Sequence, residues 1–179
     1  MNPKEKISFR PNLYLIGFMG TGKSSAGLLT AQKLKLQFFD SDQNIENQIG
    51  SSINMFFKMY GEEKFRDLEK KFIHSGHPLT GCLVSCGGGL PIPEGMLEFL
   101  KSNGKVFSLH ASVETILERT SGNNSRPLLQ SANPSNEIQT LLRKRESRYL
   151  LADQVISTDQ RSTEEVADEI VRHYLNSIN

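Results

Sequence analysis

Short apolar runs alternate along this chain with longer stretches of helical periodicity. Apolar runs of four or five residues, bounded by polar or glycine-rich segments, predict buried strands. The predicted strands cover residues 13–16, 36–39, 82–85, 106–109 and 153–157. Helices are predicted for residues 22–35, 93–100, 112–119 and 163–174, and Pro93 stands near the start of the second of these. A further, long helical stretch ends near residue 75 and is interrupted by Gly50 and Gly61.

This alternation predicts an α/β fold of three layers, in which helices cover both faces of a five-stranded parallel sheet. A length of 179 residues suits one domain, so we expect residues 1–179 to form a single unit. Ligands of such sheets bind beyond the carboxyl ends of the strands. Three of the five predicted strands end in polar or glycine-rich sequence, and we expect the functional residues there.

The overall composition disfavours several classes of function. A net charge of +1 gives no electrostatic reason to expect nucleic acid or a membrane surface as a partner. No apolar run approaches the roughly 20 residues that span a bilayer, and the N-terminal sequence lacks the apolar stretch of a signal peptide. We therefore expect a cytoplasmic protein. Because no exposed apolar stripe requires a second subunit, we also expect a monomer.

The two cysteines do not predict a disulfide framework. Cys82 and Cys86 have the spacing C-x3-C, and no second cysteine or histidine pair completes a zinc site. Buried thiols in a strand are the favoured interpretation, with a metal or redox role as the lesser alternative.

Residues 17–24 read G-F-M-G-T-G-K-S and match the phosphate-binding pattern G-x-x-x-x-G-K-[ST]. A predicted strand precedes the pattern and a predicted helix follows it, which disfavours a chance match. The glycines permit a tight turn whose N–H groups face phosphate oxygens, and the helix N-terminus adds partial positive charge. Lys23 can then reach the outer phosphates, and the Ser24 hydroxyl can hold Mg²⁺.

Asp40 and Asp42 follow the second predicted strand. On an extended backbone their side chains share one face. Beside a nucleotide site, such carboxylates can hold metal-bound water or accept the proton of an attacking hydroxyl. Asp-Ser-Asp is also ordinary turn and helix-capping sequence, so both interpretations stay open. The position after strand two of a phosphate-loop protein favours the functional one.

Two arginines are candidates for binding an anionic acceptor. Arg66 lies three residues before Glu69 in a helical pattern, so the carboxylate can orient the guanidinium, although a surface ion pair has the same spacing. Arg145 falls inside an apolar helical stripe, and an inward-facing arginine needs either a structural carboxylate or an anionic ligand as its partner. The stripe consists of Ile138, Leu141, Leu142, Tyr149 and Ala152.

Two glycine-rich or polar segments complete the candidate site. Gly87, Gly88 and Gly89 can offer N–H groups to an anion or polar substrate, and a merely flexible strand exit is the alternative. Ser85, just before them, could hold a water on Mg²⁺. The segment of about residues 120–136 is too long for a routine connection and is either a functional lid or a disordered loop. It contains Arg126, which could close over phosphates or could be an isolated basic residue.

Taken in order, these segments resemble the shikimate kinase family over nearly the whole chain. The phosphate loop is generic, whereas the combination of motifs is far more specific. The combination comprises Asp40-x-Asp42, Gly61-Glu62-x-x-Phe65-Arg66-x-x-Glu69, the triple glycine, Arg126-Pro127-Leu128 and Arg145-x-x-x-Tyr149. The resemblance implies a fold similar to nucleoside monophosphate kinases, with an acceptor-binding helical segment at about 41–75 and a lid at about 120–136. It implies transfer of the ATP γ-phosphate to the 3-hydroxyl of shikimate, in aromatic amino acid synthesis.

The resemblance also implies individual roles. The phosphates would be bound by Gly20, Thr21, Gly22, Lys23, Ser24 and Ser25. Ser24 would bind Mg²⁺, and Arg119 would stack near adenine. The acceptor side would consist of Asp42 at the reacting hydroxyl, Arg66, Gly88 and Arg145 at the carboxylate, flanked by Gly87 and Gly89, and Phe57 and Phe65 along the ring. Arg126 would close from the lid.

The expected chemistry is in-line phosphoryl transfer, with Asp40 near Mg²⁺ through water, Asp42 orienting and helping to deprotonate the acceptor, and Lys23 and Arg126 neutralising charge. Two rivals remain. A gluconate kinase would share the fold, but the paired arginines and the triple glycine argue against it. A non-catalytic nucleotide-binding module would keep the phosphate loop only, and the retention of Lys23, Ser24, Asp42 and Arg126 argues against that.

Overall fold

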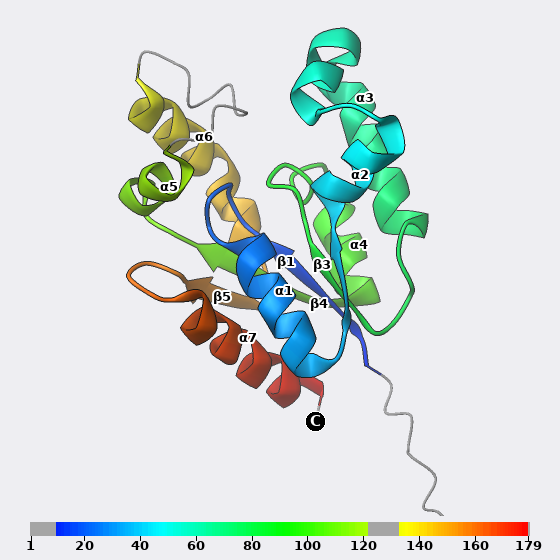
Figure 1. Ribbon diagram of the computed structural model, residues 1–179, viewed down its shortest axis with the longest axis vertical. Helices are drawn as coiled ribbons and strands as arrows, with labels where there is room; N and C mark the ends of the chain where they lie inside the picture. The colour runs from blue at the N-terminus through cyan, green and yellow to red at the C-terminus, as the bar shows by residue number, and fades with distance from the viewer. Residues whose placement is uncertain (1–9, 122–132, 179) are drawn as a thin grey trace, which may run out of the picture.

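Five parallel strands form the centre of the fold in the computed structural model, which describes residues 10–121 and 133–178 (Figure 1). The strands are β1 (Asn12–Ile16), β2 (Gln37–Asp40), β3 (Cys82–Ser85), β4 (Gly104–His110) and β5 (Gln154–Ser157). Their order across the sheet is β2-β3-β1-β4-β5, and every neighbouring pair is parallel. The prediction of an α/β fold with five parallel strands is confirmed.

Side chains of the central strand alternate between two apolar layers. Leu13 and Leu15 pack in one buried cluster, whereas Tyr14 and Ile16 pack in the other. This period of two is what an extended backbone imposes. Because both faces are buried, the strand reads as a continuous apolar run in the sequence.

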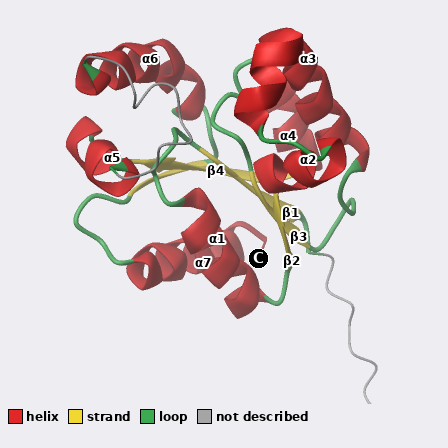
Figure 2. Cartoon of the chain, turned by 45° about the horizontal axis from the view of Figure 1, so that its top comes forward, coloured by secondary structure: helices red, strands yellow, loops and turns green. Residues whose placement is uncertain are grey.

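Different helices cover the two faces. The helices α1 (Lys23–Leu34) and α7 (Thr163–Ile178) supply buried residues to the cluster of Leu13 and Leu15. Figure 2 shows this pair on one side of the sheet and α3 and α6 on the other. The second side carries α2 (Ser41–Ile49), α3 (Ile53–Ser75), α4 (Met96–Asn103), α5 (Val113–Thr120) and α6 (Pro134–Tyr149).

One predicted helix boundary needs correction, and one predicted interruption is confirmed. The helix expected at 93–100 begins at Met96, because Gly95 in the left-handed region is its N-cap and Pro93 lies in the preceding turn. The predicted interruption of the long helical stretch before residue 75 at Gly50 and Gly61 is confirmed. Gly50 ends α2 with φ 67°, and Gly61 breaks α3 into two helical runs with φ 82° and ψ 167°.

The sheet topology decides where ligands can bind. The strand β1 lies between β3 and β4, so connections leaving these strands diverge at its carboxyl end. Such a switch point leaves a crevice that is open to a ligand. The phosphate-loop pattern follows β1 directly and therefore lies in this crevice. In the part of the chain that is described, no helix has the length and apolarity needed to cross a membrane.

Candidate functional site

The turn between β1 and α1 has backbone angles that side chains rarely tolerate. Gly17, Gly20 and Gly22 have φ angles of 135°, 76° and 87°. At Gly17 a Cβ would also clash with the carbonyl oxygen of Leu109. Gly22 is the N-cap of α1 and provides no side-chain cap for that helix end. The helix therefore presents its N-terminal N–H groups and partial positive charge toward the crevice.

Side chains of the loop brace its own backbone. The Thr21 hydroxyl donates to the Phe18 carbonyl at 2.8 Å, and Thr21 is buried. The Lys23 ammonium also donates to the Phe18 carbonyl, at 2.8 Å. The ammonium group is thus held across the loop, where it can reach an outer phosphate.

Three oxygen-bearing side chains meet beside the start of α1. The Ser24 hydroxyl donates to Asp40 Oδ2 at 2.5 Å and lies 3.2 Å from the Ser85 hydroxyl. Carboxylate and hydroxyl oxygens are the ligand type that Mg²⁺ prefers, and this ion commonly takes only one or two protein ligands beside substrate phosphates. Among the described residues, no group of three or more His, Cys, Asp or Glu is placed to hold a metal ion.

Asp40 and Asp42 do not share a face, contrary to the geometry expected for an extended backbone. The strand ends at Asp40 and the helix α2 begins at Ser41, so the two carboxylates diverge. Asp40 Oδ1 caps α2 by accepting from the N–H groups of Asp42 and Gln43, while its other oxygen bonds Ser24. Asp40 therefore both caps α2 and contacts Ser24. Asp42 instead lines a cleft beside α2 and α3.

The cleft that Asp42 lines has a volume of about 570 Å³ and lies between α2, α3, the exit of β3 and α6. Its lining combines apolar, acidic and basic side chains with three glycines. Seven predicted acceptor-side residues line it together with Asp42: Phe57, Phe65, Arg66, Gly87, Gly88, Gly89 and Arg145. Residues distant in sequence are thus gathered around one space.

The Arg66–Glu69 pair is not the exposed surface pair that the spacing also allowed. Arg66 Nη1 donates to Glu69 Oε2 at 2.5 Å, and Glu69 is only 2% exposed. A second carboxylate, the largely exposed Glu62, pairs with Arg66 Nη2. The guanidinium also lies 5.8 Å from the centre of the Phe65 ring. Arg66 is therefore fixed in orientation while its edge remains at the cleft.

The carboxylate of Glu69 lies in an unfavourable, buried environment. Burial raises the pKa of its carboxyl to about 7, against the opposing effect of Arg66 and with a further contribution from the charge of Asp42. Its Oε1 has no hydrogen-bond partner among the described residues. A buried, half-satisfied carboxylate costs free energy, which is typical of functional sites.

Charged side chains closely approach the two outer glycines of the triple glycine. A Cβ on Gly87 would clash with Asp42 Oδ1 and lie 2.9 Å from Glu69 Oε1. A Cβ on Gly89 would lie 2.5 Å from Arg66 Nη1. Of the backbone N–H groups predicted to contact a ligand, that of Gly87 instead donates to the Ser41 hydroxyl at 2.8 Å.

Arg145 lies at the wall formed by α6. Ile138 and Tyr149 of the predicted apolar stripe are buried, Arg145 is partly buried, and Ala152 lies beyond the end of the helix. The Tyr149 hydroxyl donates to the Gly88 carbonyl at 2.6 Å, which joins α6 to the glycine turn. Burial raises the pKa of Tyr149 to about 12 despite the nearby charge of Arg145.

Another cleft of about 440 Å³ opens beside the phosphate loop. Gly20, Thr21, Gly22, Ser25 and Arg119 line it, together with residues that follow β5. Arg119 donates to the Thr158 hydroxyl at 2.8 Å and to its carbonyl at 2.6 Å. This cleft has the position that a nucleotide would need, since it continues from the phosphate loop.

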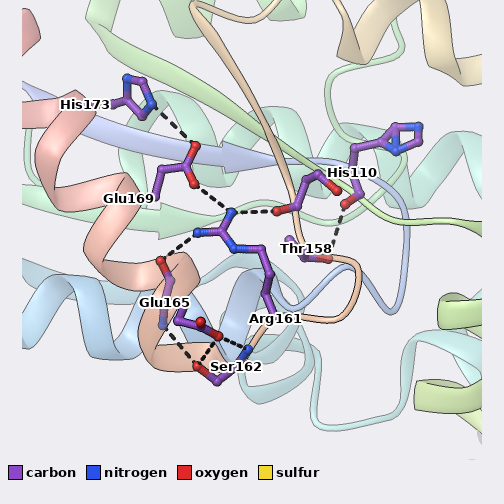
Figure 3. Close-up of polar contacts among 8 residues, drawn as sticks. His110, Thr158, Arg161, Ser162, Glu165, Glu169 and His173 are labelled. Carbon is purple, nitrogen blue, oxygen red and sulfur yellow. Dashed lines mark hydrogen bonds and ion pairs between the residues drawn. The ribbon is translucent and has the colours of Figure 1, made fainter.

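Arg161 and Ser162, which line this cleft after β5, belong to a polar network (Figure 3). Arg161 donates to the carbonyls of Ser157 and Glu165, each at 2.9 Å, and pairs with Glu169 at 2.6 Å. His173 lies 3.5 Å from Glu169 on the same helix.

Sequence patterns did not identify Thr158 as a partner of Arg119, because the two residues are 39 positions apart. Arg126 lies outside the described residues, as does most of the predicted lid.

The family model and similar curated relatives that match this chain point to the same family. The model of the shikimate kinase family matches residues 19–175. A shikimate kinase of Thermodesulfovibrio yellowstonii is 42% identical over 163 residues, which cover 91% of this chain and 94% of the relative. One from Geobacter sulfurreducens is 43% identical over 159 residues, covering 89% and 88%.

Solved structures agree with this relationship. The shikimate kinase of Acinetobacter baumannii in complex with shikimate superimposes with a TM-score of 0.89 at 34% identity, covering 98% of each chain. A gluconokinase of Sinorhizobium meliloti superimposes with a TM-score of 0.63 at 17% identity, covering 95% of this chain and 94% of that chain. The second likeness shows the fold alone.

The raised pKa of Glu69 predicts a specific pH dependence of stability. Between the ordinary value of 4.5 and the folded value of about 7, the folded state binds a proton that the unfolded state has released. The free energy of unfolding should therefore fall as pH rises through this window, by roughly 3 kcal/mol from this group. Urea unfolding of Glu69→Gln should show that much less decline than the wild type. Glu63→Gln, which removes an exposed carboxylate of the same helix, is the control, and an equal decline in all three proteins would contradict the assignment.

Proposed function

Because this chain belongs to the shikimate kinase family, we propose that it transfers the γ-phosphate of ATP to the 3-hydroxyl group of shikimate. The observation that carries this proposal is the cleft that gathers Asp42, Arg66 and Arg145 next to the phosphate loop. The family supplies the identity of the acceptor. The cleft supplies the chemistry that a small hydroxylated carboxylic acid needs.

The two arginines would bind the carboxylate of the acceptor. A planar guanidinium matches a carboxylate through two parallel hydrogen bonds. Arg66 is already oriented by Glu69, so less conformational entropy is lost when it binds. Phe57 and Phe65 line the same cleft and would cover the apolar side of the ring, and the turn of Gly87–Gly89 would contact its polar edge.

Asp42 would act on the acceptor hydroxyl. It lies in the first turn of α2 and lines the cleft that also holds the paired arginines. A carboxylate there can orient the hydroxyl and accept its proton as the bond to phosphorus forms. A carboxylate bound at the arginines would place the rest of a small ring toward Asp42.

The nucleotide would occupy the other cleft. Its phosphates would be bound by Gly20, Thr21, Gly22, Lys23, Ser24 and Ser25, and Arg119 would lie against the base. Lys23 would neutralise charge on the transferred group. Arg126 would add a second cation from the predicted lid. A bound Mg²⁺ would neutralise phosphate charge, and its protein contacts would be Ser24 directly, with Asp40 and Ser85 through water. A monomeric state and a cytoplasmic location stay predictions.

The test of this function is acceptor-dependent release of ADP. Purified protein with Mg²⁺ and ATP should release ADP rapidly with shikimate and at the background rate with gluconate or without acceptor. Release with gluconate alone would favour the rival sugar-acid kinase of the same fold. ATP binding without release under any condition would favour a non-catalytic nucleotide-binding module.

Asp42→Asn should reduce kcat by two to three orders of magnitude while ATP still binds, since removing one well-placed electrostatic contact typically costs about 3–4 kcal/mol in the transition state. The matched control is Asp67→Asn, which changes an exposed carboxylate of α3 and should leave kcat unchanged. Steady-state kinetics with shikimate and ATP provide the measurement. If Asp42→Asn keeps most of the wild-type turnover, Asp42 does not have the assigned role.

A further inference from the structure

The helix α3 contains a break whose cause is local. Gly61 has φ 82° and ψ 167°, a region of backbone space that is essentially restricted to glycine. A Cβ added at Gly61 would meet no atom of residues 10–121 and 133–178 within 4 Å. Glycine is therefore required here by the backbone angles and not by a shortage of space.

The break brings together two rings that a continuous helix would separate. Phe57 and Phe65 are eight positions apart, which corresponds to about 12 Å along an unbroken helix axis. Side chains on one helix lean in the same direction, so this separation would persist between the rings. In the structure their ring centroids are 4.9 Å apart, and the ring planes are perpendicular.

The helical run before the break packs through one face, with Ile53, Phe56 and Phe57 partly buried against the apolar core. The Ile53 N–H donates to Glu46 Oε1 at 2.9 Å, and Phe56 lies 6.4 Å from Phe65 across the break. The opposite side of this run is exposed, with Met59 64% and Met55 56% accessible. The direction taken at Gly61 is therefore a main determinant of where Phe57 lies.

We propose that Gly61 is a positioning residue for the acceptor: its glycine-only conformation folds the run Ile53–Tyr60 back, so that Phe57 forms a wall of the acceptor cleft against Phe65 and Arg66. Phe57, Phe65 and Arg66 all line that cleft, whereas Gly61 itself does not. The inference rests on the proposed function for the identity of the acceptor. Its geometric part is independent of that identity.

The geometric part can be tested without catalysis. The chain contains no tryptophan, so Phe57→Trp introduces a single fluorescent reporter next to Phe65. Adding Gly61→Ala should shift the emission of this reporter to longer wavelength, because the indole would leave its packed position. Adding Gly81→Ala is the matched control. Gly81 also has a positive φ, of 77°, and open space around its Cβ position, but it lies before β3 at the opposite end of that strand from the cleft.

The functional part is a KM-against-kcat comparison in the wild-type background. Gly61→Ala should raise the KM for shikimate at least tenfold and leave kcat and the KM for ATP within about threefold, whereas Gly81→Ala should leave all three unchanged. Phe57→Ala should raise the same KM, and combining it with Gly61→Ala should add little, because both changes remove one wall.

Each outcome has a distinct meaning. An unshifted emission in the Gly61→Ala reporter protein would overturn the proposal, as would a shifted emission with an unchanged KM for shikimate. Equal effects of Gly81→Ala on emission would also overturn it, since they would reflect general strain. A wild-type protein that does not phosphorylate shikimate would refute the proposed function, and the emission comparison would still decide whether Gly61 positions Phe57.

Discussion

The close approach of charged side chains and of the phosphate loop to the turn after β3 is the constraint on which the acceptor cleft depends. Gly87 runs beside Asp42 and Glu69, Gly88 lies against the phosphate loop with its Cβ position 3.4 Å from the Gly17 carbonyl, and Gly89 runs beside Arg66. A side chain at either end of this turn would displace a carboxylate or a guanidinium. The absence of side chains therefore lets acceptor-binding groups lie next to the phosphate loop.

The same turn explains why an unfavourable electrostatic arrangement persists. Glu69 is buried, one of its oxygens has no hydrogen-bond partner in the described part of the chain, and its charge is opposed by that of Asp42. A buried ion pair contributes little net stability, but it fixes the direction of its arginine. The benefit for binding is that Arg66 is held in one orientation before a ligand arrives, which would not be true of a mobile surface arginine. Stability of the sheet, with both faces buried, offsets this local cost.

The parts of this molecule that depend on neighbouring residues could be predicted from the sequence. The strands, the phosphate loop and the inward face of α6 follow from local periodicity and spacing. Predictions failed where a residue changes role through its context: Asp42 belongs to a helix instead of an extended strand end, and the helix after Pro93 begins at Met96. The burial of Glu69 could not be read from its spacing to Arg66, because the covering chain is distant in sequence.

The most direct test of this account is the affinity of Gly89→Ala for shikimate, measured by titration calorimetry without nucleotide. A Cβ there would lie 2.5 Å from Arg66 Cζ, so the guanidinium must leave its place beside Glu69. The account predicts at least a tenfold loss of shikimate affinity and a lower melting temperature, because the buried Glu69 loses its partner, with ATP affinity close to that of the wild type. Wild-type affinity for shikimate in this variant would contradict the claim that a side-chain-free turn sets the position of Arg66 and thereby forms the acceptor site.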